Sequence, residues 1–182
     1  MALDEVTRRL DRITGALDLA QVQYGLVGDQ AVALWVATRD PDAVRTTKDV
    51  DILVRRGDLP AVRKAALSVG MEYFEVVSVG MLLEQDNPNP RRAVHLLWAG
   101  EKVRADYVLP SPGIDDIERL GSGRLVVSLL GLLGMKLMAN RDHDRAHLTD
   151  MIDVGLVNRD MLLKLPPELA ARLDALLTES GR

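Results

Sequence analysis

The sequence predicts an α+β protein of 182 residues, and three observations lead to this fold class. Apolar residues recur at helical spacing over 3–17 with charged residues on the other face, which is typical of an amphipathic helix. Short β-prone runs bounded by glycine, proline or charged residues then follow as far as Leu109. From Ser128 the leucines are too dense for a surface helix, so buried helices are expected there.

The first strand and the second helix are expected to be joined by a tight turn. Residues 22–27 read as a short strand that ends at Gly28, and 30–37, rich in Ala, Leu and Val, as a helix that buries most of its surface. The apolar run 52–54 predicts a second buried strand. A further helix is expected over 58–70, because an aspartate and a proline stand at its start and a glycine at its end.

The middle of the chain is expected to add three more strands. Residues 71–79 are β-prone, and 86–90, with two prolines, form a loop that cannot lie inside a central strand. Residues 93–98 and 102–109 are expected as the two arms of a hairpin, since the three residues between them suit a turn. The prolines that follow end the sheet.

No linker rich in proline or glycine divides the chain, so we expect a single domain over 1–182. Its core is expected over about 1–125, and a helical carboxyl-terminal part over about 126–182, with a last amphipathic helix beginning near Pro166. The acidic amino terminus and the lack of a long apolar segment predict a cytoplasmic protein that does not bind a membrane.

The composition narrows the classes of partner. A net charge of −4 and a pI of about 5.4 argue against a surface that holds nucleic acid by bulk charge, although a local basic groove is compatible with them. Six aromatic residues, one Phe, two Trp and three Tyr, are too few for a base-stacking platform. Cysteine is absent, so disulfides and thiolate metal sites are excluded.

Asp49 and Asp51 are the most informative pair of residues. They open the buried strand at 52–54, and its period of two directs both carboxylates to one face, about 7 Å apart along the backbone. Two like charges directed at one site repel each other, so a divalent cation, usually Mg²⁺, is expected between them. The alternative is that Asp49 ends a loop and Asp51 caps a turn, because a D-x-D pair alone is common.

A third carboxylate, Asp106, lies on the expected strand over 102–109. If that strand lies near the strand of Asp49 and Asp51, three carboxylates surround one point, as two-metal phosphoryl chemistry requires. The alternative is that Asp106 pairs with Lys102 or Arg104 on a solvated face.

Gly28 and Asp29 stand between a strand and a helix. A glycine there lets the backbone approach phosphate oxygens, which the amides at a helix start favour. Asp29 is expected to act as the N-cap of that helix, and its charge would repel a triphosphate at short range.

Lys136 lies inside an apolar helix, where its ammonium group needs either an anion or a long reach to solvent. His143 and His147 have the i, i+4 spacing of a zinc pair, but Asp144 stands where a zinc hydrolase carries its glutamate, so zinc hydrolysis is a minor hypothesis. If the helix is unbroken, helical steps form a polar stripe, which faces either a ligand or solvent: Lys136, Asn140, His143, His147 and Asp150.

These residues form a pattern that spans most of the chain, in the order Leu26-Val27-Gly28, Ala31-Val32, Arg45-x-Thr47-x-Asp49-x-Asp51, Asp106, Lys136-Leu137-x-Ala139 and Arg145-x-His147-x-x-Asp150. The pattern resembles the nucleotidyltransferase superfamily with the DNA-polymerase-β-type fold, in its AbiEii-like branch of small bacterial proteins. Two residues depart from it. Asp29 stands where the family turn has a second glycine or a serine, and His147 stands where AbiEii-like proteins commonly carry an acidic residue.

The resemblance implies a mixed β-sheet with helices packed on it and a helical carboxyl-terminal part. In the family, the carboxylates matching Asp49 and Asp51, usually with a third matching Asp106, hold Mg²⁺ ions that bridge the nucleotide phosphates, and the third also activates the attacking hydroxyl. Lys136 would stabilise charge on the transferred phosphate as a catalytic residue. The nucleotide site implied by the resemblance comprises Gly28, Arg45, Thr47, Lys136 and Asp150.

The resulting hypothesis is a Mg²⁺-dependent transferase that moves a nucleoside monophosphate from an NTP onto a hydroxyl of an unknown acceptor. By resemblance, acceptors include tRNA ends, as in toxin–antitoxin systems, as well as proteins and small antibiotics, and a toxin role would imply an antitoxin partner. One alternative is a catalytically impaired nucleotide- or partner-binding module, with Asp29 blocking catalysis. Another is an antibiotic nucleotidyltransferase, which keeps the carboxylates and adds an acceptor pocket.

Overall fold

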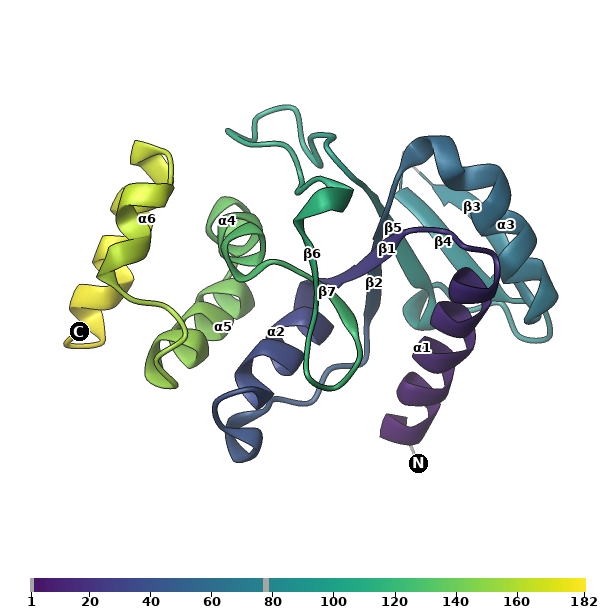
Figure 1. Cartoon of the computed structure of the whole chain (residues 1–182), viewed down its shortest axis with the longest axis horizontal. Helices are drawn as coiled ribbons and strands as arrows, with labels where there is room; N and C mark the ends of the chain where they lie inside the picture. Colours follow the sequence, from purple (N-terminus) through teal and green to yellow (C-terminus); the bar gives the residue numbers. More distant parts are fainter. Residues whose placement is uncertain (1, 77–78) are drawn as a thin grey trace.

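A computed structural model describes residues 2–76 and 79–182, and it contains a seven-stranded mixed sheet with helices packed around it (Figure 1). The strand order is β3-β4-β5-β2-β1-β7-β6. The expected α+β class with a mixed sheet is therefore confirmed. The strands are β1 (Tyr24–Val27), β2 (Val50–Val54), β3 (Met71–Val76), β4 (Val79–Glu84), β5 (Val94–Trp98), β6 (Ile117–Arg119) and β7 (Leu125–Val127).

The helices form two groups. The first, α1 and α3, contact each other, and α3 also contacts β3, whereas α2 contacts α4 and α5, and α4 contacts α6 (Figure 1). No helix within the described part of the chain is long and apolar enough to cross a membrane. The α-helices are α1 (Ala2–Leu19), α2 (Gly28–Ala37), α3 (Leu59–Ser68), α4 (Leu129–Ala139), α5 (Asp142–Asp153) and α6 (Pro167–Glu179), and short 3-10 turns include η2 (Arg56–Asp58) and η3 (Pro90–Arg92).

Strand pairing in the centre of the sheet determines which residues meet. β1 runs antiparallel to β2 and places Val27 opposite Asp51, while β5 runs parallel to β2 and places His95 beside Asp51. The end of β1, the start of β2 and the start of β5 therefore lie together at one end of these central strands. The α2 helix begins at Gly28, directly after β1, so its first turn lies at the same end of the strands.

Leucines and valines from both parts of the chain form the core. On α4, Leu132, Leu133 and Leu137 are fully buried, as the dense leucine pattern predicts. Burial of one such side chain contributes about 1.5–3 kcal/mol. The β2 strand is buried over Ile52–Val54, which fixes the strand register and with it the direction of Asp51.

The hairpin expected over 93–98 and 102–109 does not form, because 102–109 is an irregular loop. The first arm is present as β5, but its two edges are taken by β2 and β4, so no edge is left for 102–109. The β-prone stretch at 71–79 forms β3 and the start of β4, and residues 77–78 lie outside the described residues.

The long helix that would carry a polar stripe from Lys136 to Asp150 is divided in two. Asn140 adopts a left-handed conformation with φ of 48°, and its N–H bonds to the Lys136 carbonyl oxygen, which ends α4. Asparagine is one of the few residues that tolerate this conformation. The chain then turns into α5, which packs against α4, so the stripe does not lie on one helix.

Candidate functional site

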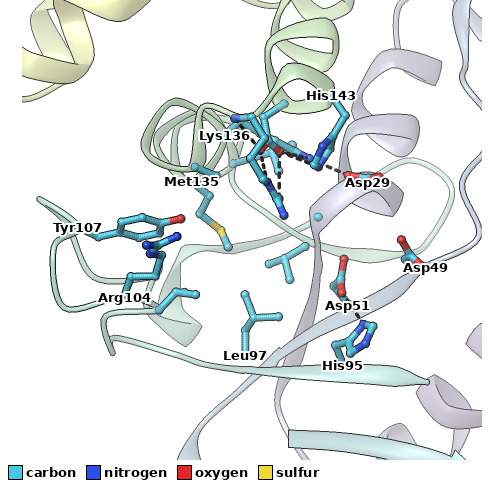
Figure 2. A pocket seen from close by; sticks show the side chains of 17 residues that line it. Asp29, Asp49, Asp51, His95, Leu97, Arg104, Tyr107, Met135, Lys136 and His143 are labelled. Atoms are coloured by element: carbon cyan, nitrogen blue, oxygen red, sulfur yellow. Dashed lines mark hydrogen bonds and ion pairs between the residues drawn. The ribbon is translucent and has the colours of Figure 1, made fainter. Parts of the chain in front are cut away.

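A cavity of about 520 Å³ lies where the end of β1 meets the starts of β2 and β5. Figure 2 shows Asp49 and Asp51 on one side of it and Arg104 with Tyr107, from the loop after β5, on the opposite side. The cavity is therefore acidic on one wall and carries a cation on the other. Its charged and aromatic lining residues are Asp29, Asp49, Asp51, His95, Arg104, Tyr107, Lys136, Arg141, His143 and Asp144.

The two aspartates of the D-x-D pair line the same cavity, as their spacing predicts. Asp51 is the second residue of β2 and is half-buried, while Asp49 precedes the strand and is exposed. Gly28 lies against Asp51 at a φ of +65°, and a Cβ at this position would overlap the Asp51 carboxylate. The glycine is thus required both by the left-handed backbone and by the space that Asp51 occupies.

His95 is the neighbour of Asp51 that the sequence analysis did not identify. It lies beside Asp51 on the parallel strand β5, with its Nδ1 3.2 Å from the Asp51 Oδ1. The hydrogen bond to Asp51 raises the pKa of His95 above its usual value, burial opposes this shift, and the charges of Asp51 and Asp49 reinforce it. In the sequence, the only signal is a lone histidine inside an otherwise apolar strand.

Asp106 does not join the other two carboxylates. It lies in the exposed loop after β5, accepts a hydrogen bond from the Arg104 Nε at 3.3 Å and does not line the cavity. The expectation of three converging carboxylates is therefore wrong, and the alternative of an exposed pair with Arg104 is observed. Within 2–76 and 79–182, no group of three or more His, Asp or Glu side chains is arranged to hold a metal ion.

Lys136 is buried in a network that joins three helices (Figure 2). Its Nζ lies 2.7 Å from the Asp29 Oδ1 on α2, 3.0 Å from the Asp144 Oδ1 on α5 and 3.2 Å from the His147 Nδ1. The second oxygen of Asp144 accepts a hydrogen bond from the Arg141 Nε at 2.7 Å. Two carboxylates thus compensate the buried ammonium group, which does not reach out to solvent.

The role expected for Asp29 differs from the observed one. No side chain caps the start of α2, and the Asp29 carboxylate accepts from Lys136 instead. The strong charge-assisted bond to a buried ammonium outweighs a capping bond to an exposed amide. Because Lys136 binds its charge, Asp29 repels an anion in the cavity less than an isolated carboxylate would.

The network shifts the titration of its own members. Burial raises the pKa of Asp144, but the hydrogen bond from Arg141 and the attraction and hydrogen bond from Lys136 outweigh it, so the net pKa lies below its usual value. Burial, together with the nearby Lys136 charge, lowers the pKa of His147. His147 therefore remains neutral beside Lys136 near pH 7, and the zinc hypothesis for His143 and His147 gains no support.

Arg45, Thr47 and Asp150 come together, but beside the main cavity rather than in it. The Arg45 guanidinium donates two hydrogen bonds, of 2.5 and 2.9 Å, to the Asp150 carboxylate. These bonds connect the segment before β2 to α5. The Thr47 hydroxyl accepts from the Asp49 backbone N–H at 3.4 Å. Arg45, Thr47 and Asp150 line a small second pocket that shares Asp29 with the main cavity, and they do not line the main cavity.

Comparison with known proteins identifies the fold. No protein-family model and no curated protein matches the sequence. The solution structure of the antibiotic-resistance factor ANT(2'')-Ia is similar, with a TM-score of 0.51 and 11% identity, over 98% of this chain and 85% of that chain. The crystal structure of ANT(2'')-Ia in complex with adenylyl-2''-tobramycin gives a TM-score of 0.52 and 11% identity, over 94% of this chain and 97% of that chain. The chain thus has a nucleotidyltransferase-type fold.

Gly28→Ala is expected to lower the free energy of unfolding by about 2 kcal/mol or more, because the new Cβ meets Asp51 in a left-handed backbone. Urea denaturation of both proteins measures this difference. Gly57→Ala is the matched control, since a Cβ at Gly57 meets nothing within 4 Å. Equal losses in the two variants would contradict the close approach of Gly28 and Asp51.

Asp144→Asn is expected to cost about 3 kcal/mol at pH 7, because it removes one partner of a buried ion pair. The folded-state pKa of Asp144 is lowered, so its stabilising contribution is present above the unfolded pKa of about 3.9 and is lost as the pH falls through the folded value. The difference between wild type and variant should therefore shrink below about pH 4. Denaturation at several pH values tests this, with Asp142→Asn, in the same turn but exposed, as the control. A difference that stays constant down to pH 2 would contradict the assignment.

Proposed function

We propose that the cavity binds a nucleoside triphosphate with Mg²⁺ and that the protein transfers the nucleoside monophosphate to a hydroxyl group of an acceptor. One observation carries this proposal. Asp49 and Asp51 face a cavity of about 520 Å³ whose opposite wall holds Arg104, in a chain with a nucleotidyltransferase-type fold. A metal-bound triphosphate needs this combination of carboxylates and cations.

The donor set fits one Mg²⁺ ion bound together with a nucleotide. Mg²⁺ prefers oxygen ligands and is usually held by one or two carboxylates, with phosphates and water completing its six positions. Asp49 and Asp51 provide those carboxylates, and Gly28 leaves the room that Asp51 needs. When bound, Mg²⁺ neutralises charge on the phosphates. Asp106, the carboxylate predicted for a second ion, lies outside the cavity, and the other two aspartates of the lining, Asp29 and Asp144, bind Lys136.

The remaining wall suits the phosphates and the base. The Arg104 guanidinium forms an exposed ion pair with Asp106 and lies over the Tyr107 ring. An exposed ion pair stabilises its position little, so the guanidinium can turn toward a triphosphate. Half-buried Tyr107, beside Arg104, offers a flat face for a nucleobase. We assign Lys136 a positioning role, because its ammonium is already bound by Asp29 and Asp144 and holds the Gly28 turn in place through Asp29.

His95 favours a second candidate, a nucleotide-binding module that does not catalyse transfer. It occupies the place beside Asp51 on the neighbouring strand, and Asp106, the predicted activator of the acceptor hydroxyl, does not line the cavity. In that case calorimetry would detect binding of Mg²⁺ and NTP, but pyrophosphate would not be released. Steady pyrophosphate release would rule out this candidate.

The acceptor is best sought by labelling. The protein is incubated with Mg²⁺ and each labelled NTP in the presence of total RNA, of an aminoglycoside or of neither. Label on RNA would favour the AbiEii-like branch and a toxin role with an antitoxin partner. Label on the aminoglycoside would favour an antibiotic nucleotidyltransferase, and label on the protein itself a protein acceptor.

Asp51→Asn is expected to reduce transfer by about 100-fold or more, because it removes one of the two carboxylates that hold the metal-bound nucleotide. Release of pyrophosphate from each NTP measures the loss. Asp106→Asn is the matched control and should retain wild-type turnover, since Asp106 is exposed and outside the cavity. Equal turnover by wild type and Asp51→Asn would overturn the enzymatic proposal.

A further inference from the structure

A second region of the molecule concentrates cations around a buried arginine. Two adjoining cavities of about 770 and 270 Å³ lie between α1, the end of β4 and η3. Both are lined by Glu5, Arg9 and Arg92, and neither shares a residue with the cavity of Asp49 and Asp51. The region is therefore separate from the proposed nucleotide site.

Arg9 is the unusual residue of this region. Its side chain is 7% exposed, and its Nε and Nη1 are buried and have no hydrogen-bond partner among the residues that the structure describes. The Glu84 Oε1 is 4.0 Å from Nε, too far for a hydrogen bond. The other oxygen of Glu84 accepts from Arg12 at 2.6 Å. A buried cation with two unused donors is costly and is normally satisfied by a partner.

The charges around Arg9 favour an anion as that partner. Burial lowers the pKa of Arg9; Glu84 and Glu5 oppose this shift, while the positive charges of Arg92 and Arg12 add to it. The acidic side chains are themselves engaged, since Glu5 pairs with Arg92 at 3.4 Å and Asp11 pairs with Arg124. Among the described residues, six cationic and three acidic side chains line the two cavities: Arg8, Arg9, Arg12, Lys48, Arg91 and Arg92 against Glu5, Asp11 and Glu84.

We propose that these cavities form a phosphate-binding site in which the Arg9 guanidinium binds the phosphate oxygens. The unused Nε and Nη1 donors suit an oxyanion, which accepts several charge-assisted hydrogen bonds at once. Lys48 and Arg91 at the rim carry further positive charge. The phosphate belongs either to a small phosphorylated molecule or to a nucleic-acid backbone, and the recognition chemistry is the same.

The position of the site gives the two sources different consequences. β2 and β5 are paired in parallel with Val50 beside Val94. Lys48 and Arg92 each precede one of these strands by two residues, so they lie at the same end of the strand pair. Lys48 is followed directly by Asp49. A backbone phosphate bound here would direct a nucleic acid toward the Asp49 side of the sheet, whereas a small phosphate would occupy a separate site. Neither case requires the transfer activity proposed above.

The test uses the full-length protein with EDTA, so that metal-dependent binding at Asp49 and Asp51 does not contribute. Inorganic phosphate is titrated calorimetrically against a chloride reference at constant ionic strength, and a short single-stranded RNA by fluorescence anisotropy. Arg9→Gln is expected to weaken binding of the probe by roughly tenfold or more, because the buried guanidinium is the central donor. Arg39→Gln is the matched control, an exposed arginine outside both cavities that should bind like the wild type.

Circular dichroism in chloride buffer checks that Arg9→Gln folds. If Arg9→Gln does not fold, the double variant Lys48→Gln/Arg91→Gln, at the exposed rim, provides the test and is expected to weaken binding severalfold. Binding of phosphate and RNA that is lost in Arg9→Gln would support a site for a small phosphate. Binding of RNA alone, lost in the same variant, would support a backbone site. Binding of neither probe by the wild type, or binding that persists in both the Arg9 and the rim variants, would overturn the proposal.

Discussion

The arrangement of the cavity depends on the ion pairs of the buried Lys136 ammonium group with Asp29 and Asp144. The ammonium group draws Asp29 from the first turn of α2 and Asp144 from the first turn of α5 to one point on α4. Loss of one partner from such a group costs about 3–5 kcal/mol, because the remaining charge stays buried. The turn at Gly28, which directly precedes Asp29, is thereby fixed relative to the three helices, and Asp51 packs against that turn.

Strand pairing places two of the three predicted metal-binding carboxylates, Asp49 and Asp51, at the cavity, whereas Asp106 lies outside it. The β2 strand presents Asp51 beside the Gly28 turn, and the parallel neighbour β5 presents His95 at the same level. The His95 ring lies within hydrogen-bond distance of the Asp51 carboxylate, whereas a carboxylate at the same position would repel it. Asp29 and Asp144 also line the cavity but bind Lys136, so under the proposed function Asp49 and Asp51 are the carboxylates assigned to the metal-bound nucleotide.

Local patterns were sufficient for the fold class, for the first helix and β1, and for the common direction of Asp49 and Asp51, because period and turn chemistry determine these features within a few residues. That Gly28 lies with the two aspartates was implied by the family resemblance, not by local patterns. Local patterns gave wrong predictions where contacts with distant parts of the chain determine the structure. Residues 102–109 have a β-prone sequence, but both edges of β5 are already paired. Asn140 looks like one more polar residue of a helix, yet it ends α4. His95 was not predicted because strand register, not sequence spacing, places it beside Asp51. Arg9 was not predicted because packing of its helix, which sequence spacing does not reveal, buries its side chain.

The proposed site is tested most directly by a crystal structure of the protein with Mn²⁺, which gives an anomalous signal, and a non-hydrolysable NTP. We expect Mn²⁺ between the carboxylates of Asp49 and Asp51, with the triphosphate extending toward Arg104 and the base near Tyr107. Density for the nucleotide outside this cavity, or Mn²⁺ bound without contact to either aspartate, would contradict the proposed site.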